Sequence, residues 1–487
     1  MSCTMETVSP TATAYPAEKA ASSIRLYATL SDEVIQYKPF HYMPNIENVQ
    51  MYNKGGYYPV HIGDILNGRF EVVHKLGSGG FGIVWLCRDI LLEKWRAVKI
   101  MTANQSAKGT EEKIFSYLRH HCSPAELKKN HILLPLEQFS LVGPNGRHSC
   151  LVMPLLGSTV ENWRLLKMDY EEQTHNDTRS VCRQIADSMR FLHSHGICHG
   201  DFRPANILME VEGIDDLDRD EILGLMGVPE CFDVETVSGQ PLTPRAPKYC
   251  VTSANELWAK TLTAKSIAII DFGESFFTTT PPISTGIPEI DAAPEVILKG
   301  YGTLGPHSDI WSLACTLFEV RTGSPLFADV GRYHPRDLKT QLSMQDSTVE
   351  TELQPDTPDI DEFAEDRAEL IEGSDYSDIF EAILGCEQTR YLNLLTDEQP
   401  EAIKYRYPRE YVLGLADLLR RMLKYGPEDR ITIKTVASHP WIIWTTPNSV
   451  KRSKEDRLQA IENIVRRITS ECGLSYAWMA YVKYYMS

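Results

Sequence analysis

The chain has 487 residues, which is enough for one large two-lobed domain with extensions or for two or three domains of average size. Its hydrophobic fraction of 43% and charged fraction of 24% are those of a globular protein with a buried core. A net charge of −17 argues against a general binder of nucleic acid or anionic membranes and suits a basic partner. The 11 cysteines include no CxxC pair, so the sequence predicts neither a zinc site nor a disulfide framework.

The N-terminal third of the chain has the pattern of a sheet preceded by a leader. Residues 1–45 show no sustained hydrophobic period and predict a mostly loose segment. From residue 69 onward, short apolar runs alternate with Gly-rich and charged turns, as is typical of an antiparallel sheet. The expected strands are residues 69–76, 83–89, 95–101, 131–141 and 148–156, with a helix over 108–119.

After residue 157 the pattern becomes mainly helical, with apolar residues three and four apart. The helices expected on this basis are residues 176–194, 308–321, 377–387, 409–424 and 455–468. Two acidic stretches interrupt the pattern: residues 210–235 hold ten acids and one base, and residues 346–376 hold twelve acids and one base. Such charge density predicts solvated insertions rather than core elements.

A glycine-rich turn lies between the first two expected strands. Gly77, Gly79 and Gly82 follow the spacing G-x-G-x-x-G, with Val84 after them. Glycine allows backbone N–H groups to approach phosphate oxygens where any Cβ would collide. Taken alone, such a motif is also what an ordinary hairpin turn looks like, so its weight depends on its context.

That context begins with a lysine in the third expected strand. Lys99, in the sequence RAVKI, can neutralise phosphate oxygens. A carboxylate from the following helix would hold it extended, and Glu111 or Glu112 could supply one. We favour Glu111 because it lies seven residues before Leu118, on the same helical face.

Residues 197–209, ICHGDFRPANILM, carry the second part of the chemistry. We expect Asp201 to accept or orient the proton of an incoming hydroxyl group and Asn206 to bind Mg²⁺. A buried strand, SIAII, then leads to Asp271, the second expected metal ligand. His199 is expected to pack and to hold this loop rather than to transfer protons.

Three further residues are expected to support this machinery. An ion pair between Glu295 and Arg430 would join the segment after Asp271 to the helical part of the chain, and Asp309 would anchor the loop around Asp201 from below. Each motif alone has a purely structural explanation. The ordered set does not share one.

This ordered set resembles the eukaryotic protein kinases over roughly residues 69–445, and the SR-protein kinases most closely. The latter phosphorylate Ser in the Arg/Ser repeats of splicing factors. The closer resemblance is carried by residues 55–77, GGYYPVHIGDILNGRFEVVHKLG, which general kinase chemistry does not require. It implies an α+β, two-lobed fold, with a small antiparallel-sheet lobe carrying one main helix and a larger, mainly helical lobe. It also implies ATP and Mg²⁺ as cofactors.

The resemblance assigns roles residue by residue. In CLVMPLLG, residues 150–157, Met153 would be the gatekeeper, and the backbone of Pro154 and Leu156 would meet adenine. Catalytic roles fall to Asp201, Arg203 and Lys99, and metal binding to Asn206 and Asp271. The nucleotide-binding set is Leu76, Gly77, Ser78, Gly79, Gly80, Phe81, Gly82, Val84, Ala97, Lys99, Glu111, Met153, Pro154 and Leu156.

The expected organisation has four parts. Residues 1–54 form a partly disordered leader, 55–157 the small lobe with its lead-in, 158–445 the large lobe, and 446–487 a helical tail. Acidic insertions are expected within the large lobe near 210–265 and 329–376. The aromatic-rich stretch 475–485 is expected to pack against the large lobe.

Two residues depart from the usual kinase pattern. Gly200 replaces the Arg that most kinases carry before the catalytic Asp, which predicts activity without phosphorylation of the activation segment. Arg203 replaces a Lys that touches the γ-phosphate. Because Arg keeps the charge but is bulkier and forked, we expect a reduced rate rather than loss of activity.

The sequence therefore predicts a serine/threonine protein kinase acting on basic, Arg/Ser-rich proteins. Two alternatives stay open: a kinase-fold scaffold with weak or no catalysis, and a related kinase with other Ser/Thr substrates. A direct nucleic-acid partner and a membrane partner are not expected. The protein is expected to be a monomer, and the resemblance implies residence in both cytoplasm and nucleus.

Overall fold

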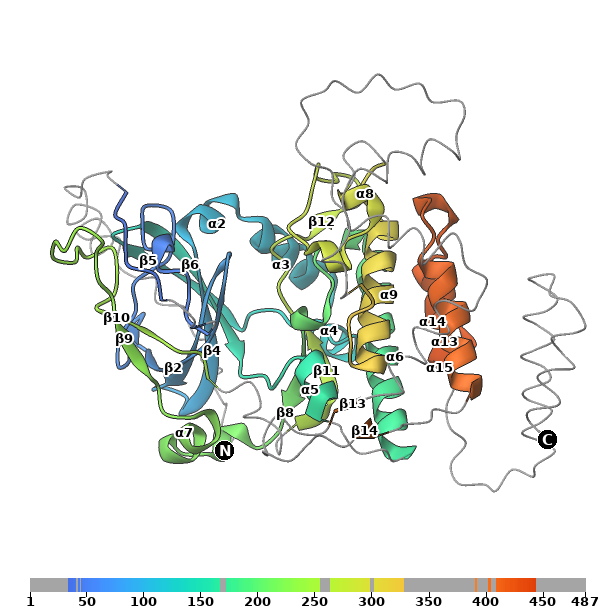
Figure 1. Ribbon diagram of the computed structural model, residues 1–487, viewed down its shortest axis with the longest axis horizontal. Coiled ribbons are helices and arrows are strands. Elements are labelled where there is room, and N and C mark those ends of the chain that lie inside the picture. The colour runs from blue at the N-terminus through green and yellow to red at the C-terminus, as the bar shows by residue number, and fades with distance from the viewer. Residues whose placement is uncertain are drawn as a thin grey trace, which may run out of the picture.

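Two lobes of different construction make up the molecule in the computed structural model, one built on a sheet and the other on helices (Figure 1). The structure describes residues 34–40, 43, 45–166, 172–254, 263–297, 302–327, 390–391, 402–403 and 409–443. The expected α+β arrangement is therefore present. Within these residues no helix is long and apolar enough to cross a membrane.

The small lobe is a six-stranded antiparallel sheet with strand order β1-β2-β3-β4-β6-β5. Its strands are β1 Ile65–Leu66, β2 Phe70–Gly79, β3 Gly82–Asp89, β4 Lys94–Met101, β5 Glu137–Gly143 and β6 Gly146–Pro154. The strand expected over 131–141 begins only at Glu137, and Pro135, just before it, has no N–H to give to a ladder.

Three helices lie between β4 and β5 along the chain. They are α2 Ala103–Lys108, α3 Thr110–His121 and α4 Pro124–Lys129, preceded by the short 3₁₀ turn η1 Val49–Met51. Helix α3 buries Glu111, Ile114, Phe115 and Leu118, which lie three and four residues apart on one face. The three apolar residues of that face belong to the same core cluster as the large lobe, so α3 connects the two lobes.

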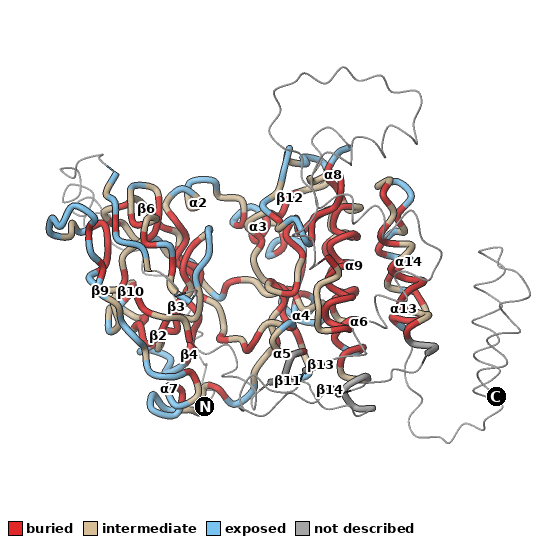
Figure 2. Tube along the Cα trace, viewed as in Figure 1, coloured by how far each residue is buried: buried red, intermediate tan, exposed pale blue. Residues whose placement is uncertain are grey.

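The large lobe packs its helices around α9, which is buried from Ser308 to Thr322 (Figure 2). A helix that is buried on every side forms the centre of its lobe. The helices are α5 Val160–Leu166, α6 Glu172–Ser194, α8 Pro294–Ile297, α9 Pro306–Thr322, α13 Arg409–Met422, α14 Ile433–Ser438 and α15 Pro440–Ile443. The 3₁₀ turns are η2 Pro204–Asn206, η4 Glu289–Asp291 and η5 Pro427–Asp429.

Short antiparallel strand pairs complete the fold. They are β7 Ile197–Cys198 with β12 Phe276–Phe277, β8 Ile207–Val211 with β11 Thr263–Ile269, β9 Cys231–Asp233 with β10 Tyr249–Val251, and β13 Arg390–Tyr391 with β14 Ala402–Ile403. Strands β7 and β8 flank the loop that carries Asp201, and β11 leads to Asp271. These pairs therefore fix the two candidate catalytic loops next to each other.

The acidic stretch 210–235 corrects the expectation of a solvated insertion without core elements. It contains the turn η3 Ile214–Asp216 and helix α7 Arg219–Met226, whose residues Ile222 and Met226 are buried. These two pack with Trp95 of the small-lobe sheet. The acids serve the helix end: the Asp218 carboxylate accepts a hydrogen bond from the backbone N–H of Glu221, and Glu221 accepts one from that of Asp218. The high density of acids in residues 210–235 therefore did not reveal that α7 has one apolar face.

The remainder of this insertion returns to the small lobe and covers part of the leader. Tyr37 is 1% exposed although no hydrophobic period marks its segment, and it forms an isolated bridge with Thr236. It packs in a core cluster with Val234 and Val251 of the insertion. The contacts that bury Tyr37 thus combine nearby hydrogen bonds to Gln50 and Tyr52 with residues about 200 positions further along the chain.

Several expectations lie outside the described residues. These are the segment 1–33, the helix 377–387, the acidic stretch 346–376, the helix 455–468 and the aromatic stretch 475–485.

Replacing Ile222 by alanine tests whether the insertion is part of the core. Ile222 is 0% exposed, so Ile222→Ala should lower the free energy of unfolding by about 2–4 kcal/mol in urea titration, through lost burial and a residual cavity. Val228→Ala is the matched control, because Val228 is 77% exposed, and it should change stability by less than about 0.5 kcal/mol. Equal, small effects of both changes would mean that α7 does not stabilise the small lobe.

Candidate active site

A cleft of about 610 Å³ lies at the meeting of the sheet and the helical lobe. All the residues that the sequence analysis assigned to catalysis, nucleotide binding and metal binding line it. They come from β2, β3, β4, α3, β6, the loop between β7 and β8, and the segment after β11. The structure therefore brings together residues that are up to about 200 positions apart in the chain.

The glycine-rich hairpin joins β2 to β3 over the cleft, with Gly79 paired to Gly82. A Cβ at Gly82 would lie 2.3 Å from the carbonyl oxygen of Ile100, so packing within the protein requires glycine there. At Gly77, Gly79 and Gly80, by contrast, an added Cβ would meet no atom within 4 Å. Packing does not require glycine at these three positions. Their bare backbone is available to a ligand that approaches closely.

Lys99 lies at the centre of the cleft between two carboxylates. Its Nζ is 3.3 Å from Oε1 of Glu111 and 2.9 Å from Oδ1 of Asp271. Although burial disfavours its charged form, Glu111 and Asp271 together raise the pKa of Lys99. The structure pairs Lys99 with Glu111, the residue favoured from the helical register, while Glu112 is exposed.

Asp271 has a left-handed backbone conformation, with φ of 62°. Non-glycine residues adopt this conformation at a cost, and it recurs at functional sites. Burial opposes ionisation of its carboxyl, but the Lys99 ammonium lowers the pKa of Asp271 below its usual value. The residue is thus held as a carboxylate facing the cleft.

The loop between β7 and β8 places Asp201 next to Asn206. The Asn206 side-chain amide donates to Oδ2 of Asp201 at 2.7 Å and to its backbone oxygen at 2.8 Å. Arg203 Nε donates to Oδ1 of Asp201 at 3.2 Å. Burial raises the pKa of Asp201, with Arg203 and His199 acting in the opposite direction. A carboxyl group whose pKa lies above the usual Asp value is a better proton acceptor than an exposed one.

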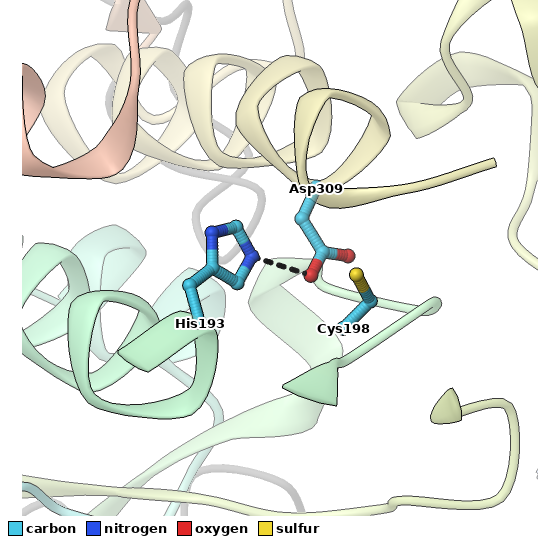
Figure 3. Close-up of side chains that lie close together, drawn as sticks. All are labelled: His193, Cys198 and Asp309. Atoms are coloured by element: carbon cyan, nitrogen blue, oxygen red, sulfur yellow. Dashed lines mark hydrogen bonds and ion pairs between the residues drawn. The ribbon is translucent and has the colours of Figure 1, made fainter. Parts of the chain in front are cut away.

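Asp309 of α9 anchors this loop from below, as its place in the sequence predicted. It accepts hydrogen bonds from the backbone N–H groups of His199 at 2.8 Å and Gly200 at 3.0 Å. His193 of α6 also contacts it, at 2.9 Å, with Cys198 nearby (Figure 3). Both carboxylate oxygens are therefore engaged, and burial raises the pKa of Cys198, which keeps it a thiol. This grouping holds the loop and does not have the free ligands of a metal site.

The local backbone geometry explains why residue 200 is a glycine. Its φ is +77°, and a Cβ there would lie 2.3 Å from the carbonyl oxygen of Glu274. A side chain at this position would require the loop or the turn at Glu274 to move. The departure from the kinase pattern is thus part of the local backbone geometry.

Asn206 and Asp271 have the donor atoms that a hard divalent cation prefers. Among the described residues, no hydrogen bond reaches Oδ1 of Asn206 or Oδ2 of Asp271. An amide oxygen and a carboxylate oxygen that face one cleft fit Mg²⁺. These two residues would hold such an ion.

The ion pair between Glu295 and Arg430 is confirmed. Two bonds of 2.7 and 2.8 Å join the guanidinium to the carboxylate, and both side chains are 0% exposed. Ser308 adds a hydrogen bond of 2.9 Å to Glu295. The pair joins the start of α8 to the loop after η5.

Sequence reasoning missed two residues of this region. Ala254, at the end of the insertion, lines the cleft although nothing in its local sequence marks it. Glu319 of α9 is 7% exposed, and within the described residues no side chain pairs with its carboxyl. Its only sequence signal was its place ten residues after Asp309 on an otherwise apolar helix.

Comparison with known proteins gives a consistent result. The protein kinase domain family matches residues 70–217 and 253–442, and leaves out the part of the insertion between them. SRSF protein kinase 3 of Mus musculus is 36% identical over 167 residues, which is 34% of this chain and 29% of that protein. The serine/threonine-protein kinase SRPK of Physarum polycephalum is 28% identical over 424 residues, 82% of this chain and 92% of that protein. The serine/threonine-protein kinase SKY1 of Saccharomyces cerevisiae is 28% identical over 233 residues, 45% of this chain and 30% of that protein.

Removing one partner of the buried ion pair should destabilise the large lobe. Arg430→Ala leaves Glu295 buried without its counter-charge and should lower the free energy of unfolding by about 3–5 kcal/mol. Arg190→Ala is the control, because Arg190 and Asp187 form an exposed pair at 2.8 Å, and it should cost about 1 kcal/mol or less. Urea titration of both variants measures the difference. A loss for Arg430→Ala as small as that of the control would contradict the structural role of the pair.

Proposed function

The chain belongs to the protein kinase family, and on this premise we propose that it transfers the γ-phosphoryl group of ATP to serine or threonine hydroxyls of basic, Arg/Ser-rich proteins. The observation that carries the proposal is the convergence of Lys99, Asp201, Asn206 and Asp271 on one cleft. Phosphoryl transfer depends mainly on positioning and on neutralising charge, and these four residue types supply both. The similarity to proteins named SRSF protein kinase 3 and SRPK supports the proposed substrate class.

Each residue has a part in the proposed reaction. Lys99 would bind the α- and β-phosphate oxygens, and the bare backbone of the glycine-rich hairpin would donate N–H groups to the remaining phosphate oxygens. Asn206 and Asp271 would hold Mg²⁺, which when bound offsets negative charge on the phosphates. Asp201 would accept the proton of the attacking hydroxyl group. Met153, Pro154 and Leu156 line the cleft where adenine would lie.

Arg203 is the residue whose role differs most from the usual kinase pattern. Its Nε is bonded to Asp201, and 32% of its side chain is exposed in the cleft. The guanidinium is thus placed to reach the γ-phosphate while its Nε orients the carboxylate of Asp201. Because one side chain serves both groups, we expect transfer at a reduced rate.

A scaffold without catalysis is the alternative from a different class. A kinase fold that has lost activity would be expected to lack at least one of the ion-pair or metal-binding residues. Here Lys99 contacts both Glu111 and Asp271, and Asp201 is bonded to Asn206. These contacts favour catalysis over a scaffold. A related kinase with other Ser/Thr substrates is the second alternative.

Glu319, whose carboxyl has no side-chain partner among the described residues, supports basic substrates. Helix α9 packs against α5, η2 and η4, which brings Glu319 close to Glu161, Asp291 and Arg203. Burial and the two neighbouring acids raise the pKa of Glu319 to about 8, and Arg203 acts in the opposite direction. An arginine side chain from a peptide in the cleft would supply the counter-charge that Glu319 lacks.

The proposal extends to organisation and setting. We infer a kinase unit over 55–445, divided at residue 157 into small and large lobes, that acts as a monomer. Its partners would be ATP and a basic protein substrate rather than nucleic acid or membrane. Residence in the cytoplasm and the nucleus, which the sequence resemblance implies, is part of the same proposal.

Changing Asp201 to asparagine should separate binding from transfer. Asp201→Asn should lower the rate of transfer from radiolabelled ATP by about 10²–10⁴-fold, because the proton acceptor is lost, while ATP binding changes little. For the unaltered protein, the rate should fall as pH drops through the pKa of Asp201, which is raised above the ordinary Asp value. Asp187→Asn, on the exposed face of α6, is the matched control and should leave the rate unchanged. Binding of ATP by the unaltered protein with no transfer to any peptide would instead support the scaffold.

Substitution of Glu319 tests the basic substrate. Glu319→Gln should raise KM for an Arg/Ser peptide by about tenfold, because a charge-assisted hydrogen bond is lost, and leave KM for ATP unchanged. Ionisation of Glu319 strengthens its attraction for arginine, so KM for that peptide should fall as pH rises through about 8, and Glu319→Gln should remove this dependence. Glu112→Gln, at an exposed acid of α3, is the control. A peptide array in which Arg content has no effect would favour the alternative substrates.

A further inference from the structure

Residues 55–60, which we call the lead-in, open the stretch 55–77 that general kinase chemistry does not require. In the structure it reaches the tip of the glycine-rich hairpin. The hydroxyl of Tyr57 donates a hydrogen bond of 3.0 Å to the backbone carbonyl of Gly79, at the last residue of β2. Tyr57 is 4% exposed, so this contact lies largely out of solvent.

Backbone hydrogen bonds fix the lead-in on the small lobe. Gly55 N–H donates to the carbonyl of Asn145 at 2.8 Å, and the Asn145 side-chain amide donates to the carbonyl of Tyr57 at 2.7 Å. On the other side, Ala103 N–H at the start of α2 donates to the carbonyl of Gly56 at 3.0 Å. A Cβ at Gly56 would lie 1.7 Å from the carbonyl oxygen of Met51, so only glycine fits. Tyr57 therefore projects from a rigid base.

A buried polar group supports the tyrosine from behind. The rings of Tyr57 and Tyr52 meet edge to face with centroids 5.5 Å apart, and the Tyr52 hydroxyl donates to Glu47 at 2.7 Å. Glu47 in turn forms an ion pair with Lys75 of β2, and both side chains are 1% exposed or less. Lys75 lies four residues before Gly79. These contacts run from Gly79 through Tyr57, Tyr52 and Glu47 to Lys75, so they start and end on β2, the strand that leads into the hairpin.

The insertion joins the same group. Ala254 N–H donates to the carbonyl of Lys75 at 2.8 Å, and Ala254 also lines the cleft. The Asn145 side chain donates equally to the carbonyl of Arg245 in the insertion, at 2.7 Å. The support for Tyr57 therefore includes residues from the leader, the sheet and the insertion.

We propose that Tyr57 is a positioning residue that holds the glycine-rich hairpin in the conformation that receives ATP. The inference rests on the proposed function. The hydrogen bond engages a carbonyl of the hairpin and none of its N–H groups. It therefore does not compete with phosphate oxygens for those donors. The other printed restraints on that part of the hairpin are backbone contacts: the pairs of the β2–β3 ladder and a hydrogen bond of 2.9 Å from Thr102 N–H to the carbonyl of Phe81. The Tyr57 hydroxyl adds a buried side-chain contact to them. Burial raises the pKa of Tyr57 to about 12, so the hydroxyl stays a donor at every working pH.

The experiment removes only the hydroxyl, by Tyr57→Phe in the full chain. Hydrogen–deuterium exchange of the free protein, read on the peptide that spans residues 76–83, should be faster than in the unaltered protein. The Kd for a fluorescent ATP analogue and KM for ATP should both rise, by roughly threefold to tenfold, because the competent conformation is less populated. The value of kcat and the melting temperature should change little.

Tyr249→Phe is the matched control. Its hydroxyl accepts a hydrogen bond of 3.2 Å from Ile62 N–H, within the small lobe but away from the hairpin. This variant should leave exchange over 76–83 and the Kd unchanged. A general loss of small-lobe stability would affect both variants alike.

The outcomes separate this inference from the proposed function. Binding of the analogue by Tyr57→Phe as tight as by the unaltered protein, with unchanged exchange over 76–83, would overturn the positioning role alone. An unaltered protein that binds no analogue would overturn the proposed function and the role of Tyr57 in nucleotide binding together. Faster exchange and weaker binding confined to Tyr57→Phe would support the role.

Discussion

The arrangement of the cleft depends on a lysine ammonium removed from water and held between two carboxylates. Lys99 is 7% exposed, and its partners come from α3 and from a segment 172 residues further along the chain. An ammonium in such a place is stable only while its counter-charges are present, because burial without them costs several kcal/mol. The strand β4, the helix α3 and the turn at Asp271 must therefore meet. Once they do, the hairpin above and the catalytic loop below face the same volume.

This requirement explains why the chemistry was predictable from the sequence. A cation for phosphates, a carboxylate to hold it and oxygen ligands for a metal each restrict the residue type, so their order along the chain identifies them. The same is true of Glu295 and Arg430, because each buried charge requires its partner. Patterns of apolar residues also located strands β2 to β6, with β5 beginning later than expected, and helices α3, α6, α9 and α13, but not the two-residue strand β1.

The remainder could not be predicted because it depends on contacts between distant segments. The acids of α7 and its flanks concealed a short apolar face, and a helix of this length is stable only against the sheet it covers. Tyr37 is buried partly by residues of the insertion, and Ala254 lines the cleft where the insertion returns to the small lobe. Glu319 is one acid among many in the sequence, and only the structure shows that it is buried and that no described side chain pairs with it.

The backbone at Gly200 also restricts which sequences this fold can explore. An arginine there would meet the carbonyl of Glu274 and would need a positive φ that side chains seldom adopt. Acquiring the basic residue that lets many kinases respond to a phosphate on their own activation segment would thus require the backbone of the loop or of the turn at Glu274 to shift. Replacing Gly200 alone by arginine would therefore lower the stability of the protein. The geometry at Gly200 thus separates the catalytic loop of this chain from a charge on the activation segment, which leaves control to features other than that contact.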